Sequence, residues 1–164
     1  MNSRISKILE FHKIKEHLLK HASSSLGKEL VQGLKPSSQL EEVQKWQDET
    51  DEAYQVLRIK GNIPLGGIFD IRSFVKRAVI GGVLHANELL DIASTIASSR
   101  QLKKFVESID EEQLAIPILR ELTNNIVVLN ELEKSIKHCI DDHGYVMDGA
   151  SDALRSIRSK IRTH

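Results

Sequence analysis

Apolar residues recur along this chain at intervals of three and four positions, the spacing that places side chains on one face of an α-helix. The strict alternation of apolar and polar residues that indicates a β-strand is scarce. The sequence therefore predicts helices along most of its length. The apolar face of the first helix consists of Ile8, Phe11, Ile14, Leu18 and Ala22, and that of the second, which Pro36 stops, consists of Leu26, Leu30 and Leu34.

The longest clear helix is predicted to follow Ser38. Its apolar face consists of Leu40, Val43, Trp46, Thr50, Ala53 and Leu57. Ser38 and Glu41 have the S-x-x-E spacing of a capping box, so we expect them to begin the helix, and we expect Gly61 to end it. Because Trp46 falls on the apolar face, we expect a buried side chain whose replacement by alanine costs about 3–5 kcal/mol.

Glycine, proline and polar residues divide the middle of the chain. Residues 62–67 are the most loop-like stretch, and Gly81-Gly82 ends a short helix. Gly66-Gly67 and Gly81-Gly82 are candidates for hinges or close packing, or simply for tight turns. The short helix carries Ile71, Phe74, Val75 and Ala78, and the next, from about Ala86 to Val106, carries Leu89, Ile92, Ala93, Ile96, Leu102, Phe105 and Val106.

Two further helices are predicted between residues 110 and 140. Asp110 can cap the first, with Leu114, Ile118 and Leu122 inward, and Pro117 should kink it or confine it to the residues that follow. The second helix carries Leu129, Leu132, Ile136 and Ile140. Residues 141–149 then form a polar loop with an extended pair around Val146.

The final stretch begins like a helix and lacks the usual signals of an end. Ser151 and Asp152 are good N-cap residues, and Leu154, Ile157 and Ile161 share one face. Because no Gly, Asn or Pro closes the segment, we expect the chain to stop inside a longer helix of a larger protein. The complete pattern predicts an all-α fold of about eight helices, with a helical core domain in residues 1–150 and the start of a long helix in residues 151–164.

Composition indicates a soluble domain. The 164 residues are 40% hydrophobic and 28% charged, with 23 basic and 23 acidic side chains. This balance argues against a nucleic-acid surface over the whole molecule, although a local patch remains possible. The single Cys139 suits a reducing compartment. No apolar run approaches the ~18 residues of a membrane span, and no signal peptide is evident, so we expect a cytoplasmic protein without a membrane partner.

Three kinds of catalytic or ligand-binding site can be tested by spacing. Gly27-Lys28 would belong to a phosphate loop only with Gly at position 22 and Ser or Thr at position 29, but the chain has Ala22 and Glu29. Ser23, Ser24 and Ser25 lie near histidines but lack a nucleophile elbow, so they are better interpreted as a helix break and an N-cap. His138, Cys139, Asp141, Asp142 and His143 crowd together without zinc spacing, which favours a helix end and a solvated turn. We therefore expect no catalytic, cofactor-binding or metal-binding residue in this chain.

The last helix carries the most coherent basic face. Arg155, Arg158 and Arg162 follow i, i+3, i+7 spacing, and Lys160 lies nearby. This face has two interpretations: the soluble flank of a coiled coil, or a contact surface for nucleic-acid phosphates with salt-sensitive affinity. No aromatic residues interleave the charges, so base stacking is not indicated. These four residues are the candidate nucleic-acid contacts.

Several segments, in order along essentially the whole chain, resemble the N-terminal part of the second bacterial MutS type, often called recombination-suppressing MutS with an endonuclease tail. The resemblance starts at Leu9-Glu10-Phe11-His12-Lys13-Ile14, where the family usually has an acidic residue in place of His12. The most telling pieces are residues 76–84, Lys-Arg-Ala-Val-Ile-Gly-Gly-Val-Leu, and residues 88–93, Glu-Leu-Leu-Asp-Ile-Ala. Further similar segments are residues 22–30, 34–36, 49–53, 58–61, 64–67 and 150–158.

The resemblance implies a structural role within a longer protein. Such proteins begin with a helical core or lever, followed by a clamp arm, a dimerising ATPase domain and a small nuclease domain. They are reported to bind branched DNA, to suppress recombination, and to bind and split collided ribosomes. Residues 1–164 would be the first half of the core, and the helix from Ser151 would be the arm that ascends to the clamp.

This resemblance also implies the partners and cofactors. The parent would be a homodimer that binds DNA and ribosomes or ribosomal RNA, and its ATP and Mg²⁺ would lie in the ATPase domain outside this chain. In that case the chain relays the nucleotide state to the clamp. The alternative is a stand-alone helical module that binds nucleic acid or ribosomes through Arg155, Arg158, Lys160 and Arg162.

Overall fold

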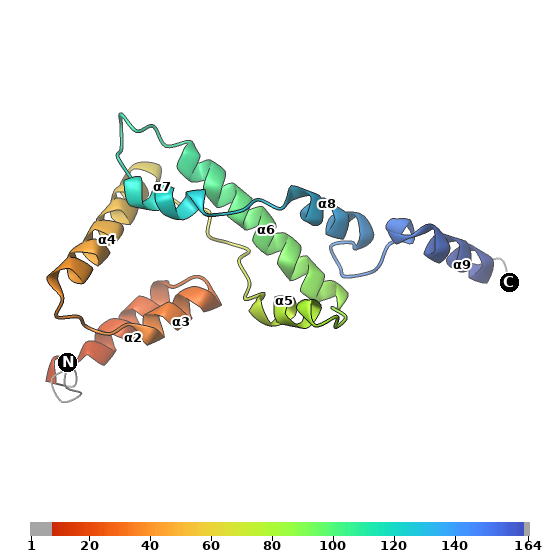
Figure 1. Cartoon of the computed structure of the whole chain (residues 1–164), viewed down its shortest axis with the longest axis horizontal. Helices are drawn as coiled ribbons and strands as arrows, with labels where there is room; N and C mark the ends of the chain where they lie inside the picture. The colour runs from red at the N-terminus through yellow and green to blue at the C-terminus, as the bar shows by residue number, and fades with distance from the viewer. Residues whose placement is uncertain (1–7, 163–164) are drawn as a thin grey trace. The chain divides into compact units, whose positions relative to one another are not determined.

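The computed structural model describes residues 8–162, and within that range the fold is all-α, as predicted (Figure 1). Eight α-helices and one short 3₁₀ helix lie in this range, together with an isolated β-bridge between Ile140 and Val146. The helices are α2 (Phe11–His21), α3 (Ser25–Gly33), α4 (Leu40–Lys60), α5 (Arg72–Val79), α6 (Ala86–Glu107), α7 (Pro117–Asn124), α8 (Asn130–Cys139), η1 (Asp148–Ala150) and α9 (Asp152–Arg162).

The chain divides into two compact units, each built from two separate stretches of sequence. The first unit comprises residues 1–66 and 101–126, and the second comprises residues 67–100 and 127–164. Each unit has its own buried core. The first core is formed by Val56, Val106, Ile109 and Ile116, and the second by Ile92, Ala93, Ile96, Ile136 and Ile140. The domain boundary expected near residue 150 stays a prediction.

In the first unit, α4 contacts α7 through an apolar residue, Val56, and a charged residue, Glu52. Val56 is the buried residue of α4, with 1% of its surface exposed. The carboxylate of Glu52, one turn earlier, accepts hydrogen bonds from the backbone N–H groups of Ile118 (3.1 Å) and Leu119 (2.9 Å). Those groups have no partner inside α7 because they belong to its first turn. α7 begins at Pro117, which confirms that this proline confines the helix to the residues after it.

Helices α2 and α3 form a pair at the start of the first unit, as Figure 1 shows. The predicted cap is confirmed, because the Ser24 hydroxyl accepts a hydrogen bond of 3.0 Å from the N–H of Gly27. Neither helix contains a buried residue. The pair therefore contributes little to the core of the unit.

Three local predictions for this unit are wrong. Helix α4 begins after Gln39 without a side-chain cap, so Ser38 and Glu41 form no capping box. Asp110 caps only a turn, through the N–H of Glu112 (3.0 Å), because the next helix starts at Pro117. Trp46 is 39% exposed, since α4 turns its Val56 side to the core.

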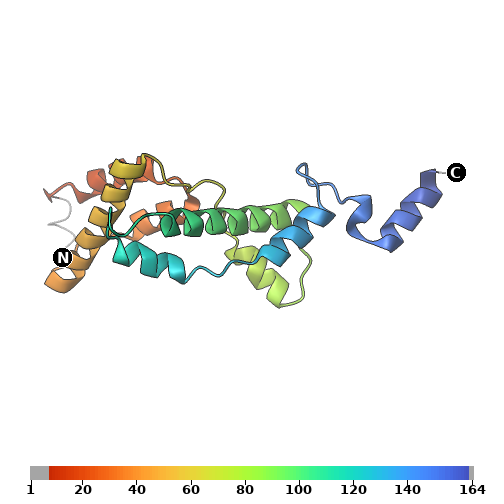
Figure 2. The ribbon, with the colours of Figure 1, turned by 90° about the horizontal axis from the view of Figure 1, so that it is seen from above.

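In the second unit, α5 and α8 lie next to the first half of α6, as Figure 2 shows from above. The segment before α5 is fastened to α6 by two hydrogen bonds: the Ser94 hydroxyl donates to the Gly67 carbonyl (3.0 Å), and the Thr95 hydroxyl accepts from the N–H of Phe69 (3.1 Å). Gly67 has a φ of +77°, and a Cβ at this position would lie 2.6 Å from the Ser98 hydroxyl. Close packing, which was one of the predicted roles for Gly66-Gly67, is therefore the role of Gly67.

Candidate functional site at the base of the last helix

Helix α9 begins at a serine cap. The Ser151 hydroxyl accepts a hydrogen bond of 3.1 Å from the N–H of Leu154, which would otherwise lack a partner in the first turn. This confirms the N-cap predicted for Ser151. The apolar side of the helix is largely open, with Ile157 56% and Ile161 70% exposed.

One carboxylate, Asp148 in η1, holds α9 to the segment that precedes it. Arg158 donates a hydrogen bond to Asp148 (2.6 Å) and another to the carbonyl of Val146 (2.7 Å). Arg162, one turn later, lies 3.2 Å from the other carboxylate oxygen of Asp148. The hydrogen bond from Arg158 is the main cause that holds the pKa of Asp148 below its ordinary value, and the charge of Arg162 acts in the same direction.

The four predicted nucleic-acid contacts all lie on α9, and ion pairs engage Arg155, Arg158 and Arg162 among them. Arg158 and Arg162 bind Asp148, and Arg155 lies 3.5 Å from the fully exposed carboxylate of Asp152. With Lys160, these four basic and two acidic side chains carry a formal charge of about +2. The sequence identified the basic face but not Asp148, which lies outside the helix.

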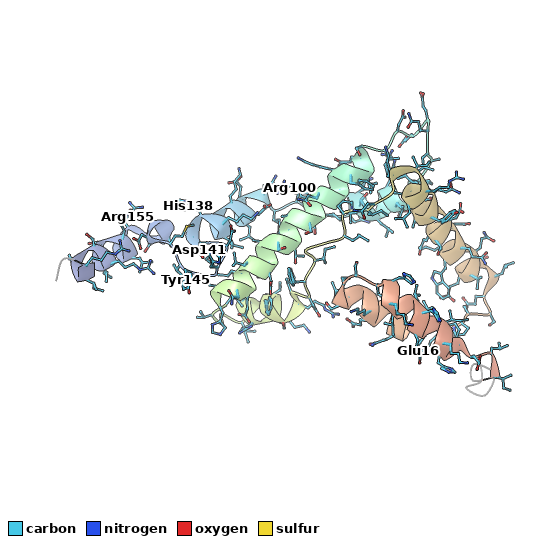
Figure 3. All side chains as sticks on the ribbon, turned by 180° about the vertical axis from the view of Figure 1, so that it is seen from behind. Glu16, Arg100, His138, Asp141, Tyr145 and Arg155 are labelled. Atoms are coloured by element: carbon cyan, nitrogen blue, oxygen red, sulfur yellow. The ribbon has the colours of Figure 1, made fainter. Side chains whose placement is uncertain are left out.

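The segment between α8 and η1 is a tight hairpin-like loop. The Ile140–Val146 bridge closes it, and the Met147 N–H donates to the Cys139 carbonyl (2.8 Å). At its tip, one carboxylate oxygen of Asp141 accepts from the N–H groups of His143 (3.0 Å) and Tyr145 (2.8 Å). The extended pair predicted around Val146 is therefore confirmed. Figure 3 labels Asp141 and Tyr145 of this loop, together with His138 of α8 and Arg155 of α9.

The crowded acidic, histidine and cysteine side chains of this segment do not converge on a metal site. Within residues 8–162, His, Cys, Asp and Glu side chains nowhere gather in groups of three or more that could hold a metal ion. Asp141 instead stabilises the loop through its two backbone hydrogen bonds. The loop is thus a structural connection between α8 and η1.

Helices α6 and α8 are joined by a buried carboxylate. Glu133 is 6% exposed, and it accepts hydrogen bonds from Arg100 of α6 (3.0 and 2.9 Å) and from Lys137 of its own helix (2.7 Å). The hydrogen bond from Lys137 is the main cause that lowers the pKa of Glu133, and Arg100 contributes as well. Figure 3 shows Arg100 on α6.

Sequence reasoning missed this cluster. The i, i+4 spacing of Glu133 and Lys137 is visible in the chain and could have suggested an ion pair. Arg100 lies 33 residues away from Glu133, and no local pattern reveals that contact.

Together, these contacts form a continuous linkage through the second unit, which we call the α6–α9 linkage. It runs from Arg100 to Glu133, along α8 to the Ile140–Val146 bridge, and through Asp148 to Arg158. Hydrogen bonds or ion pairs join α6 to α8, the two ends of the loop to each other, and η1 to α9, and the covalent chain makes the remaining connections.

The other sequence candidates lie in ordinary structural positions. Gly27 and Lys28 are in the first turn of α3, where the Ser24 cap occupies the N–H of Gly27. Along residues 8–162, helices long and apolar enough to cross a membrane are absent.

Comparison with known proteins gives consistent matches. The chain is 57% identical over 163 residues to "Endonuclease MutS2" of Geobacillus sp. (strain WCH70). The match covers 99% of the chain and 21% of that protein. It is 52% identical over 161 residues to the protein of the same name from Halalkalibacterium halodurans, covering 98% of the chain and 20% of the relative. It is 54% identical over 163 residues to that of Bacillus cytotoxicus, covering 99% and 21%. No family model matches the chain. The chain thus spans about one fifth of the length of these relatives.

Proposed function

Because this chain belongs to the MutS2 family, we propose that it is a structural lever domain. Nearly all of its length matches about one fifth of the length of each relative. In this role it relays a conformational change between other parts of the parent protein and carries out no reaction of its own. The proposal concerns this segment, whereas the relatives' name, endonuclease, describes proteins five times longer.

The α6–α9 linkage is the observation that supports this role most directly. Large conformational changes in proteins are commonly rigid-body movements of packed helices. A helix follows such a movement only if its base is tied to the moving element. Asp148 ties the base of α9 through two arginines, and Glu133 ties α8 to α6.

For the parent protein we propose the wider set of activities that the family resemblance implies. The parent would be a homodimer that binds and hydrolyses ATP with Mg²⁺ in a separate domain, with the nuclease activity in another. It would bind branched DNA and suppress recombination, and it would bind collided ribosomes through ribosomal RNA. Residues 1–164 would couple the ATP state to closure of a clamp around the nucleic acid, in the cytoplasm.

A second candidate is a nucleic-acid or ribosome-binding module that acts through α9. The exposure of its basic side chains favours it: the Arg155 side chain is 62% exposed and that of Arg162 is 71% exposed. The pairing of Arg158 and Arg162 with Asp148 argues against it, because a phosphate would have to compete with a carboxylate already in place.

The lever role is tested in the full-length parent by Asp148→Asn, with Asp142→Asn as the matched control. Asp142 is an exposed carboxylate in the same segment. We expect Asp148→Asn to weaken the dependence of clamp closure on ATP while the ATPase rate without nucleic acid stays within about twofold. Closure can be followed by fluorescence energy transfer between labelled clamp arms. Unchanged coupling in Asp148→Asn would contradict the proposal.

The second candidate is tested with the chain of residues 1–164 by filter binding of branched DNA and of RNA across a salt series. A contact surface on α9 predicts binding that weakens steeply with salt and is lost in Arg155→Glu. No binding at low salt would eliminate this candidate and leave the lever role unaffected.

A further inference from the structure

Helix α4 has two nearly opposite faces, and only one of them packs within the first unit. Glu52 and Val56 face α7, where Val56 is buried and Glu52 binds the first turn of α7. At 100° per residue, Val43 lies about 140° around the helix from Val56. The second face therefore points away from the contact with α7.

That second face carries a shallow, open and mainly apolar groove along the one helix, which we call the α4 groove. Val43, Trp46, Gln47, Thr50, Asp51 and Tyr54 line it, and its volume is about 480 Å³. Trp46 is 39% exposed and Tyr54 is 60% exposed, and Leu40, at the start of the same helix, is 80% exposed. Aromatic side chains of this size supply much of the energy of helix–helix and protein–protein contacts when they are buried.

The spacing of the groove residues suits another helix. Positions 43, 47, 50 and 54 are separated by four, three and four residues. This spacing is typical of the contact face of a helix that packs along a second helix. Amphipathic helices commonly bind in apolar grooves of this type. A helix is therefore the kind of segment that fits the α4 groove.

Chain length and charge indicate what covers the groove. The chain spans about one fifth of its relatives, so four fifths of such a protein lie outside it. One edge of the groove carries an acidic side chain, since Asp51 lines it. We infer that the α4 groove receives an amphipathic helix with basic edges from the part of the parent polypeptide outside residues 1–164. This inference rests on the assignment of the chain as one segment of a MutS2-type protein.

Two measurements on the full-length parent test the inference. The first is hydroxyl-radical footprinting read by mass spectrometry at single peptides, which compares the native protein with the same protein unfolded in urea. We expect oxidation of Trp46 and Tyr54 to fall at least about fivefold in the native state, because a packed helix excludes solvent from both rings. Oxidation of Tyr54 at more than about half of its unfolded rate would overturn the inference.

The second measurement identifies the occupant by photo-crosslinking from a benzoylphenylalanine at position 47. The control places the same group at Lys45, an exposed position on the other side of α4. The parent is prepared as a mixture of ¹⁵N-labelled and unlabelled chains. We expect cross-links from position 47, and not from position 45, to one Lys- or Arg-bearing helical peptide outside residues 1–164, with both peptides from one isotope.

Three outcomes of that measurement would overturn the inference. Mixed-isotope cross-links would assign the groove to a second copy, and a cross-link to a residue within 1–164 would assign it to this chain itself. An absence of cross-links from position 47 would mean that the groove is open in the parent. None of these outcomes bears on the coupling measured with Asp148→Asn, so the lever role and the groove can fail separately.

Discussion

Arg100 of α6 donates through one guanidinium nitrogen to both carboxylate oxygens of Glu133 in α8, at 3.0 and 2.9 Å. Glu133 is 6% exposed and the side chain of Arg100 is 29% exposed, so the pair is largely shielded from water. Because the pair is shielded, removing one partner would leave the other charge buried without a counter-charge, and this would lower the free energy of unfolding.

We expect Glu133→Gln to lower the free energy of unfolding by about 1–3 kcal/mol, because it removes the charge that binds Arg100 and Lys137. The measurement is urea denaturation of the chain followed by circular dichroism. Glu131→Gln is the matched control on the same helix: Glu131 is 87% exposed, and its ion pair with Lys134 should contribute less than about 0.5 kcal/mol. Equal effects of the two substitutions would contradict the importance assigned to the buried pair.

The stability of the chain should also fall in acid. The folded-state pKa is lowered for Glu133, Glu88 and Asp148, and for Asp70 it is lowered from 3.8 to about 2 by the hydrogen bonds from Arg72. A lowered pKa means that the ionised form is favoured by folding, so its contribution is complete above the unfolded pKa and is lost as the pH falls through the folded pKa.

For Glu133 the ordinary value is 4.5, so the difference in stability between the wild type and Glu133→Gln should be constant near neutral pH and shrink below about pH 4.5. Urea midpoints measured from pH 7 to pH 3 test this. A difference that grows as the pH falls would have the wrong sign and would exclude Glu133 as the group responsible.

Gly67 should not tolerate alanine. Its φ of +77° is strained for residues with a side chain, and the new Cβ would lie 2.6 Å from the Ser98 hydroxyl and 2.9 Å from the Ser94 hydroxyl. We expect Gly67→Ala to destabilise the chain by about 1–3 kcal/mol. Gly66→Ala is the control, since a Cβ at that position meets nothing within 4 Å. Thermal unfolding of both variants decides the matter, and a Gly67→Ala variant as stable as Gly66→Ala would show that the close approach to α6 is absent in solution.

Glu52→Ala should loosen α7. The substitution removes the acceptor for the N–H groups of Ile118 and Leu119, and the loss of a helix cap costs about 0.5–2 kcal/mol. Hydrogen exchange of these two amides, measured by NMR, should become faster, while exchange in α8 is unchanged. Glu49→Ala, one turn earlier on α4, is the control variant. Faster exchange in both variants would indicate a general effect of acidic residues on α4 rather than a cap.

Local pattern was sufficient to predict most of the helices, because helical periodicity and breaks are properties of neighbouring residues. Gly61 ends α4, Pro117 begins α7 and Ser151 caps α9, and each of these depends on residues only a few positions apart. The face that a helix buries depends on its partner. The prediction for Trp46 was wrong for this reason. The sequence identified an apolar face on α4, but α7 packs against the side of α4 that carries Val56.

The candidate site could be predicted only in part, for the same reason. The basic residues of α9 are evident in the sequence, but the partner of Arg158 lies ten residues before it in a short 3₁₀ helix. The contact between Arg100 and Glu133 spans 33 residues and joins two helices whose packing no spacing rule reveals. Ion pairs between elements depend on tertiary structure. The sequence therefore did not reveal that acidic side chains already pair with Arg155, Arg158 and Arg162 of α9.

The two compact units interleave along the chain, and this has a consequence for synthesis. The first unit needs residues 101–126 to complete the core that residues up to 66 begin, while residues 67–100 wait for their own partners beyond residue 126. A ribosome must therefore release the chain past Ile116 before the first core can close, and past Ile140 before the second core can close. Until then, Val56 and Ile92 each belong to an incomplete core, so apolar side chains that the folded chain buries are exposed to aggregation during translation.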